Sequence, residues 1–259
     1  MILCGGQGTR LRDVTELLPK PMVSIGPHPI VWHIMKCFSA YGIRRFILCL
    51  GYKREKFIDY FLNYHAHATD MTVHLGNPPV LTYHGVVGEE DWEVTLADTG
   101  DRTMTGARIA RAARYLHSDD HDILVTYGDG LANVNVHDLL RFHSLNKNCI
   151  TVTAVHPSGR FGEMKLDGQL VCGFQEKPQT EDGLINGGYM VIRRSFIEQY
   201  LTTDPNLSLE HEPMRRAVAD RQMSAYIHDG FWQCMDTPRE YQLLNQMWES
   251  GDAPWKVGW

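Results

Sequence analysis

A nearly continuous apolar run, Arg45 to Leu50 (RFILCL), lies between two segments of helical periodicity and constrains the fold more than any other feature. Such a run is typical of a strand that is buried on both faces of a parallel sheet. Before it, residues 30–41 carry apolar side chains at helical spacing, and Gly42 ends that pattern. After it, residues 53–63 are helical again. This alternation predicts βαβ units in a mostly parallel sheet.

Strand and helix patterns continue to alternate along the rest of the chain. Residues 71–97 differ, because Gly, Pro and Asn turns separate three short strand-like segments there (MTVHL, VLTYH and EVTLA). The other predicted strands are 123–127, 149–155, 163–166, 170–175 and 187–192, and the other predicted helices are 106–116, 135–145 with Asn135 as its N-cap, 195–201 and 208–220. The sequence predicts a single α/β domain over residues 1–259, with a small β-rich insertion and a C-terminal lobe.

The last helix has the most complete start signal in the chain. Thr237 stands at the N-cap, Pro238 at the first helical position, and Glu240 three residues after the cap. Asp236 is therefore predicted to lie just before a helix, directly after the apolar run Phe231 to Met235.

The acidic balance of the chain argues against two classes of partner. Its formal net charge is -6 at pH 7, whereas nucleic acids and anionic membranes attract a basic face. No apolar run approaches the ~20 residues that cross a bilayer. The segment MILCGGQGTR has neither the basic region nor the long apolar core of a signal peptide. We therefore expect a cytoplasmic protein with no nucleic-acid or membrane partner.

The cysteines predict no special chemistry. None belongs to a CxxC pair and most lie in apolar stretches, so we expect buried reduced thiols rather than a zinc site or disulfides. The six cysteines are Cys4, Cys37, Cys49, Cys149, Cys172 and Cys234.

A glycine-rich segment follows the first apolar stretch, Met1 to Cys4. That stretch is short for a core strand of ~5–6 residues, so either the natural start lies a few residues upstream or the strand is clipped. The segment reads Gly5-Gly6-Gln7-Gly8-Thr9-Arg10, and glycines after a strand let backbone N–H groups approach a phosphate. It is not a Walker A loop, which needs a lysine, nor a dinucleotide fingerprint, which needs a third spaced glycine.

A lysine between two prolines strengthens the phosphate hypothesis. Pro19 and Pro21 restrict the backbone on both sides of Lys20, so this side chain is presented by a stiff arm. The plainer interpretation, a glycine turn followed by a surface lysine, loses ground once Arg10 and Lys20 are considered together.

Two aspartates are candidate metal ligands. Asp129 lies between two glycines at the end of a predicted buried strand, where ligands of open parallel sheets bind. Asp236 precedes the last helix. One or two carboxylates together with ligand phosphates are typical of a Mg²⁺ site. For each aspartate alone, a turn or a helix cap is the favoured explanation, and their spacing does not indicate that they meet.

Two further motifs are weaker. Glu176-Lys177-Pro178 ends a predicted strand, and Asn186-Gly187-Gly188 begins another. Glycines at a strand start suggest close approach by a ligand, although an ordinary loop and a bulge would explain both motifs.

In order along the chain, these motifs resemble those of the nucleotide-sugar pyrophosphorylases. The resemblance rests on LCGGQGTR (3–10), PKPM (19–22), Gly128-Asp129, Glu176-Lys177-Pro178 and Asn186-Gly187-Gly188. It extends nearly from end to end, and the segments DTGDRTMTGARI (98–109) and GFWQCMDTPRE (230–240) look like the glucose-1-phosphate cytidylyltransferase branch. Two departures are a first strand shorter than the family's and Cys4 at a position where alanine is usual.

The resemblance implies a Rossmann-like nucleotidyltransferase fold, with a mixed, mostly parallel sheet between helices, and a homo-oligomer. It implies the formation of CDP-glucose and pyrophosphate from CTP and glucose 1-phosphate with Mg²⁺. By motif matching, the nucleotide would contact Leu3, Gly5, Gly6, Gln7, Gly8, Thr9, Arg10, Thr103, Arg108 and Gly128. Arg10 and Lys20 would be catalytic, Lys20, Glu176, Lys177 and Gly188 would face the sugar phosphate, and Asp129 and Asp236 would hold the metal.

Three alternatives remain open at this point. The same chemistry could use dTTP or UTP, or another sugar 1-phosphate. A non-catalytic regulatory subunit could bind a sugar nucleotide without turnover, since fold does not fix activity; loss of Arg10, Lys20 or Asp129 would mark it, and all three are present. A metal-dependent glycosyltransferase is disfavoured by the GGxGTR and PKP motifs.

Overall fold

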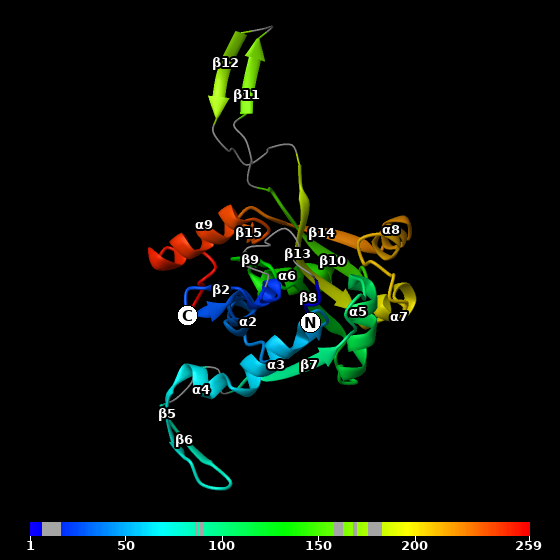
Figure 1. The fold of residues 1–259 in the computed structure, drawn as a ribbon. Coiled ribbons are helices and arrows are strands. Elements are labelled where there is room, and N and C mark those ends of the chain that lie inside the picture. Colours follow the sequence, from blue (N-terminus) through cyan, green and yellow to red (C-terminus); the bar gives the residue numbers. More distant parts are fainter. Residues whose placement is uncertain (7–16, 86–87, 89–90, 158–162, 168–169, 176–182) are drawn as a thin grey trace.

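A seven-stranded sheet forms the centre of the computed structural model, which describes residues 1–6, 17–85, 88, 91–157, 163–167, 170–175 and 183–259 (Figure 1). Its strands are β1 (Ile2–Leu3), β4 (Arg45–Leu50), β7 (Glu93–Asp98), β8 (Asp122–Tyr127), β10 (Ile150–Val155), β13 (Ile185–Arg193) and β14 (Met223–His228). They lie in the order β14-β10-β13-β8-β1-β4-β7. Only β13 is antiparallel to its neighbours, so the sheet is mixed and mostly parallel, as predicted.

Helices cover both faces of this sheet (Figure 1). Each helical layer buries its own apolar cluster against the strands. One layer consists of α2 (Ile30–Ser39), α3 (Arg54–Leu62), α6 (Val136–Asn146) and α9 (Pro238–Glu249), and the other of α5 (Thr105–Ala112), α7 (Arg194–Tyr200) and α8 (Glu212–Ala219). The structure is therefore a three-layer α/β sandwich.

Strand β4 shows why the apolar run predicted the fold. Phe46, Leu48 and Leu50 belong to the cluster under α2, whereas Ile47 and Cys49 belong to the cluster under α5. Successive side chains of a strand point to opposite faces, so a strand covered on both faces has to be apolar throughout. The short β1 follows the same rule at the centre of the sheet, between β4 and β8.

Both predicted helix caps are confirmed. The Asn135 side chain accepts a hydrogen bond from the Asp138 N–H at 3.2 Å and starts α6. At α9, the Thr237 hydroxyl accepts from the Glu240 N–H, and the Glu240 carboxylate accepts from the N–H groups of Thr237 and Asp236 at 2.8 and 2.7 Å. These bonds fix Asp236 at the helix N-terminus.

The β-rich region differs from the prediction in one strand. The segments MTVHL and VLTYH form a two-stranded ribbon, β5 (Asp70–His74) and β6 (Val80–His84), which projects from the body beyond the short helix α4 (Tyr64–Ala68) (Figure 1). The third segment, EVTLA, is instead the parallel edge strand β7 of the main sheet, paired with β4. A second ribbon, β11 (Glu163–Asp167) and β12 (Leu170–Gln175), projects at the top of Figure 1, whereas β5 and β6 lie at the bottom.

The C-terminal part does not form a lobe of its own. Met235, Leu244 and Trp255 are buried in the same cluster as α2. Strand β14, which the sequence did not predict, pairs in parallel with β10 at the other edge of the sheet. Its side chains are half-buried or exposed, so it lacks the apolar run that marks a central strand. The same region contains β15 (Trp232–Cys234), paired with β9 (Gly130–Ala132).

The cysteines agree with the prediction as far as the structure describes them. Cys4, Cys37, Cys49 and Cys149 are buried free thiols, and Cys234 is a half-buried one. Burial raises the pKa of Cys37 to about 12 and that of Cys49 to about 11, so both thiols stay protonated. The Cys172 side chain lies outside the described residues. In the described part of the chain, no helix is long and apolar enough to cross a membrane.

Candidate active site

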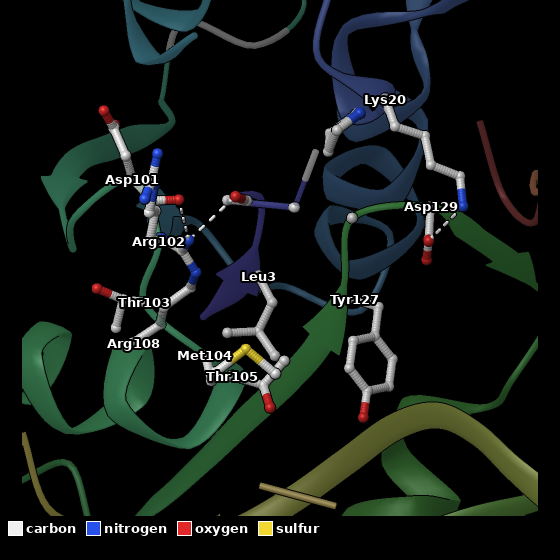
Figure 2. A pocket seen from close by; sticks show the side chains of 14 residues that line it. Leu3, Lys20, Asp101, Arg102, Thr103, Met104, Thr105, Arg108, Tyr127 and Asp129 are labelled. Atoms are coloured by element: carbon white, nitrogen blue, oxygen red, sulfur yellow. Dashed lines mark hydrogen bonds and ion pairs between the residues drawn. The ribbon is translucent and has the colours of Figure 1, made fainter. Parts of the chain in front are cut away.

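A cavity of about 460 Å³ opens at the carboxyl ends of β1 and β8, beside the N-terminus of α5 (Figure 2). Ligands of open α/β sheets bind at this edge. Four segments that are distant in sequence form its walls. The lining residues are Leu3, Gly5, Gly6, Lys20, Pro21, Asp101, Arg102, Thr103, Met104, Thr105, Arg108, Tyr127, Gly128 and Asp129.

Close packing explains Gly5 and Gly128, two glycines that line this cavity. A Cβ on Gly5 would collide with the guanidinium of Arg108, and one on Gly128 would lie 2.8 Å from Pro21 Cγ. The Gly128 N–H donates to the Leu3 carbonyl at 3.0 Å, which joins the ends of β1 and β8. Glycine is therefore needed at both positions, and the backbone stays within reach of a bound phosphate.

Arg108 is buried at the α5 side of the cavity, with only 4% of its surface exposed. Its guanidinium donates to the carbonyls of Leu50, Gly100 and Gly5 at 3.0, 2.8 and 3.0 Å and to the Thr99 hydroxyl at 2.8 Å. Burial lowers the pKa of this guanidinium. Arg108 thus lines the cavity, and its hydrogen bonds brace the walls. Contact with a nucleotide, which the motifs predict, stays a prediction.

Thr103 and its neighbours line the cavity beside the N-terminus of α5. The Thr103 hydroxyl is buried and accepts from Arg111 Nη1 at 2.9 Å. Arg111 also donates to the Thr99 carbonyl at 3.0 Å, so the loop before α5 is held at two points. Leu3, which also lines the cavity, is buried.

At the other end of the cavity, the Lys20 ammonium lies between two carboxylates. It donates to Asp129 Oδ2 at 2.7 Å and to Asp236 Oδ1. Lys20 is 8% exposed, whereas the side chains of Asp129 and Asp236 are 33% and 27% exposed. Burial alone would lower the pKa of Lys20, but the two carboxylates outweigh it and raise the pKa above the ordinary 10.5. The ammonium is therefore charged at neutral pH.

The pairing of β9 with β15 brings the two aspartates together. Gly130 lies opposite Cys234 in this antiparallel pair, and the Met235 N–H donates to the Asp129 carbonyl at 2.8 Å. Both aspartates therefore lie at the same end of the ladder and share the Lys20 ammonium. Within the described residues, no group of three or more His, Cys, Asp or Glu side chains could hold a metal ion.

Sequence reasoning missed Tyr127, which lines the cavity, and its partner Glu210, which lies behind it. Figure 2 shows the Tyr127 ring on the cavity wall with its hydroxyl pointing away from Asp129. That hydroxyl donates to Glu210 Oε1 at 2.6 Å. Glu210 Oε2 accepts from Thr105 at 2.6 Å and from Ser208 at 2.5 Å. A carboxylate behind the cavity thus links β8 to the start of α5. No motif marked Glu210, because its partners are dispersed along the chain.

Gly188 lies behind Tyr127 and is not among the residues that line the described cavity. Its φ of +83° favours glycine, and a Cβ there would lie 2.5 Å from the Tyr127 ring. Its N–H donates to Asn186 Oδ1 at 2.9 Å. The predicted residues Gln7, Gly8, Thr9, Arg10, Glu176 and Lys177 lie outside the described residues.

Known proteins resemble this chain in sequence and in fold. Glucose-1-phosphate cytidylyltransferases of Salmonella typhi and Salmonella typhimurium are each 44% identical to it over 257 residues, which cover 99% of this chain and 98% of theirs. The crystal structure of HddC from Yersinia pseudotuberculosis superposes with a TM-score of 0.63 at 22% identity, over 95% of this chain and 97% of that one. This last likeness concerns the fold alone.

The family model described as nucleotidyl transferase matches residues 1–247. That range contains the whole cavity, both aspartates that hold Lys20, and every strand of the central sheet. The chain therefore belongs to the nucleotidyl transferase family.

Proposed function

We propose that this chain transfers a cytidylyl group from CTP to glucose 1-phosphate, forming CDP-glucose and releasing pyrophosphate. The two Salmonella relatives with that enzyme name support the substrates, because the identity extends over nearly the full length of both chains. The structural observation that carries the proposal is the Lys20 ammonium between Asp129 and Asp236 at one end of the cavity. A reaction between two phosphate anions needs positive charge there.

The nucleophile of this reaction needs no general base. The second pKa of a phosphate monoester is ~6, so the attacking oxygen of glucose 1-phosphate is already ionised at neutral pH. It attacks the α-phosphorus of CTP, and the bond from that phosphorus to the bridging oxygen breaks. Pyrophosphate leaves with the electron pair. The barrier comes from repulsion between anions, which the charged Lys20 and the backbone N–H groups beside Gly5 and Gly6 would offset.

The roles of the other residues follow from motif and position. Leu3, Gly5, Gly6, Thr103, Arg108 and Gly128 line the cavity and would surround the nucleotide. By motif alone, Gln7, Gly8, Thr9 and Arg10 would extend the phosphate loop, with Arg10 as a second catalytic cation beside Lys20. Glu176, Lys177 and Gly188 would face the sugar phosphate, again by motif.

Members of this family typically use a divalent metal ion. We propose Mg²⁺, held by Asp129 and Asp236. The two residues fit such an ion, because their carboxylate oxygens are hard ligands and already share one cation, the Lys20 ammonium. When bound, Mg²⁺ would neutralise negative charge on the phosphates. Two carboxylates alone leave most of its coordination to water and to those phosphates, as is usual for Mg²⁺.

Pyrophosphate release tests the proposed substrates. The purified protein is assayed with Mg²⁺ against CTP, dTTP, UTP, ATP and GTP, each combined with glucose 1-phosphate, mannose 1-phosphate and galactose 1-phosphate. We expect strong release only with CTP and glucose 1-phosphate. Release with another pair would retain the chemistry and correct the substrate. No pyrophosphate release with any pair, while CTP still binds, would indicate a sugar-nucleotide-binding regulatory protein instead of an enzyme.

We also infer that the protein forms a homo-oligomer, and the ribbon β5–β6 supports this. Its register puts Met71 opposite Tyr83 and Val73 opposite Leu81 on one face. These four apolar side chains are 44%, 40%, 38% and 50% exposed. A two-stranded ribbon is marginal alone and gains stability when such a face is covered.

Analytical ultracentrifugation of two double variants tests this inference. Val73→Lys with Leu81→Lys should lower the mass of the assembly. The control, Thr72→Lys with Thr82→Lys, places the same charges on the opposite face of the ribbon and should leave the mass unchanged. A monomeric wild-type protein would contradict the inference.

A further inference from the structure

The segment around Lys20 is fixed by its backbone, so only the side chain is free to change partner. Pro19 and Pro21 flank Lys20 in a 3-10 turn, Lys20–Met22, which is closed by hydrogen bonds from Met22 N–H to the Pro19 carbonyl at 2.8 Å and from Val23 N–H to the Lys20 carbonyl at 3.1 Å. The four-carbon stem of lysine is flexible. The position of the ammonium is therefore determined by which anions lie within reach of the stem.

The anions within reach are the carboxylates that fit the metal ion. Lys20 Nζ contacts Oδ2 of Asp129 and Oδ1 of Asp236, and thereby bridges the two side chains from within the cavity wall. A divalent ion that bound both carboxylates would have to enter beside this ammonium. Two positive charges held by the same pair of carboxylates would repel each other strongly in a partly buried site.

We propose that Lys20 occupies the cation site of Asp129 and Asp236 in the nucleotide-free protein, so that the lysine ammonium and a divalent ion compete for the same two carboxylates. The phosphates of a bound nucleotide relieve this competition, because they give the ammonium another anion within the same cavity. The metal ion then enters together with the nucleotide rather than before it. The nucleotide step, but not the competition itself, rests on the proposed function.

Two consequences follow from this exchange of partners. Without nucleotide, the site holds one positive charge from the protein itself, which satisfies both carboxylates. With nucleotide, Lys20 turns toward the phosphates and the carboxylates become available to the metal ion. The two cations are thus brought to the reacting phosphates in a single coupled step, which links metal affinity to nucleotide affinity.

Mn²⁺ binding to the metal-free and nucleotide-free protein tests the competition, with free Mn²⁺ measured by electron paramagnetic resonance. Lys20→Met removes the ammonium and retains the stem, so it should bind Mn²⁺ about tenfold or more tightly than wild type, as expected when a competitor occupies the site about nine-tenths of the time. Lys256→Met is the matched control, because it removes one exposed positive charge from the C-terminal segment. It should bind Mn²⁺ like wild type.

Two further measurements show whether the gain in Mn²⁺ affinity arises at the two carboxylates. Asp129→Asn in the Lys20→Met background should abolish it, since the gained ion is held by that carboxylate. Adding CTP without a sugar phosphate should tighten Mn²⁺ binding in wild type more than in Lys20→Met, because only wild type has an ammonium to displace. Circular dichroism checks that each variant is folded, and Lys20→Gln replaces Lys20→Met if the latter is not.

Equal Mn²⁺ affinity in wild type and in a folded Lys20 variant would overturn the competition. So would a gain that survives Asp129→Asn, because the ion would then lie elsewhere. Neither result bears on the transfer reaction, which is tested by pyrophosphate release from wild type. Conversely, a wild-type protein silent in that assay would leave the Mn²⁺ comparison intact.

Discussion

The two ends of the cavity each contain a buried cation, and the two cations differ in what surrounds them. Lys20 is 8% exposed and is held by two carboxylates, Asp129 and Asp236. Arg108 is 4% exposed and donates to backbone carbonyls and to the Thr99 hydroxyl. One cation has charged partners, and the other has neutral ones.

This difference in partners predicts a catalytic role for Lys20 and a structural role for Arg108. Arg108 connects the ends of β1 and β4 with the loop before α5, and its fork of donors fixes these segments relative to one another. Moving it would take a donor from the carbonyls of Gly5 and Gly100, whereas the Leu50 carbonyl would keep the two donors of Thr99. If the proposed competition holds, Lys20 can leave its carboxylates without such a loss, because a metal ion would replace it there. The Lys20 end of the cavity should therefore tolerate exchange of its cation, and the Arg108 end should not.

Replacing Lys20 should have the largest effect, and on catalysis rather than on folding. Lys20→Ala removes a positive charge that would face the reacting phosphates, so turnover should fall by about 10²–10³-fold, as for the loss of other preorganised charge donors. The variant should still be folded by circular dichroism at the assay temperature, although its two carboxylates lose their shared cation and with it some stability. Lys256→Ala, the matched surface control, should retain full turnover. Pyrophosphate release near the wild-type rate in Lys20→Ala would remove the distinction between the two cations.

Replacing Arg108 should act in the opposite way, mainly on stability. Arg108→Met retains the length of the side chain but takes a charged donor from the carbonyls of Gly5 and Gly100, which should lower the free energy of unfolding by about 3 kcal/mol. The melting temperature should fall by roughly 6–12 °C. Arg102→Met, at an exposed neighbour on the same wall, should change it little. If urea unfolding gave Arg108→Met the stability of wild type, the bracing role would be wrong.

The same contrast explains what the sequence could predict. Strand β4 and helix α2 were predictable because their apolar periodicity reports the layers that cover them. The start of α9 was predictable because its capping box is contained in four residues. The glycine loop and Lys20 were identified by short motifs that carry their own physical reason. In each case the signal is local.

Features that depend on distant partners could not be predicted from the residues alone. Asp129 and Asp236 meet through the pairing of β9 with β15, and a ladder of three residue pairs has no periodicity to detect. The carbonyl partners of Arg108 come from backbone, which no side-chain pattern reveals. The sequence assigned strand β7 to the insertion. Its parallel partner β4 lies far away in the chain, since the paired residues Arg45 and Glu93 are 48 positions apart.

A change at Glu210 tests whether the walls on the Arg108 side of the cavity also determine the affinity for the nucleotide. Glu210→Gln replaces with a neutral amide the carboxylate that accepts hydrogen bonds from the hydroxyl groups of Tyr127 and Thr105, which lie on two walls of the cavity. Loss of one charge-assisted hydrogen bond should raise KM for CTP by about tenfold with kcat nearly unchanged. Tyr127 remains a donor in both proteins, because burial raises its pKa in each, and in wild type the charge of Glu210 raises it further. A drop in kcat with unchanged KM would contradict a role in positioning the walls.

The pH dependence of that variant has a defined sign. Loss of solvent around the Glu210 carboxylate would raise its pKa, but hydrogen bonds from Ser208, Thr105 and Tyr127 outweigh this and lower the pKa below the ordinary 4.5. A carboxyl with a lowered pKa stabilises the folded state above its unfolded pKa and loses that contribution as pH falls through the folded one. The stability difference between wild type and Glu210→Gln should therefore be constant at neutral pH and shrink below about pH 4.5.

The smallest expected effect comes from the helix cap behind Asp236. Thr237→Ala removes the hydroxyl that accepts from Glu240 N–H, which should lower the free energy of unfolding by about 1 kcal/mol. Asn135→Ala removes the equivalent cap of α6, away from the carboxylates, and should cost about the same stability. Only Thr237→Ala should also raise the Mg²⁺ concentration for half-maximal pyrophosphate release, by about two- to threefold for a few tenths of a kcal/mol, because only that cap directly follows a carboxylate of the proposed cation site, Asp236. Equal Mg²⁺ dependence in the two variants would mean that Asp236 is positioned by β15 and not by its helix.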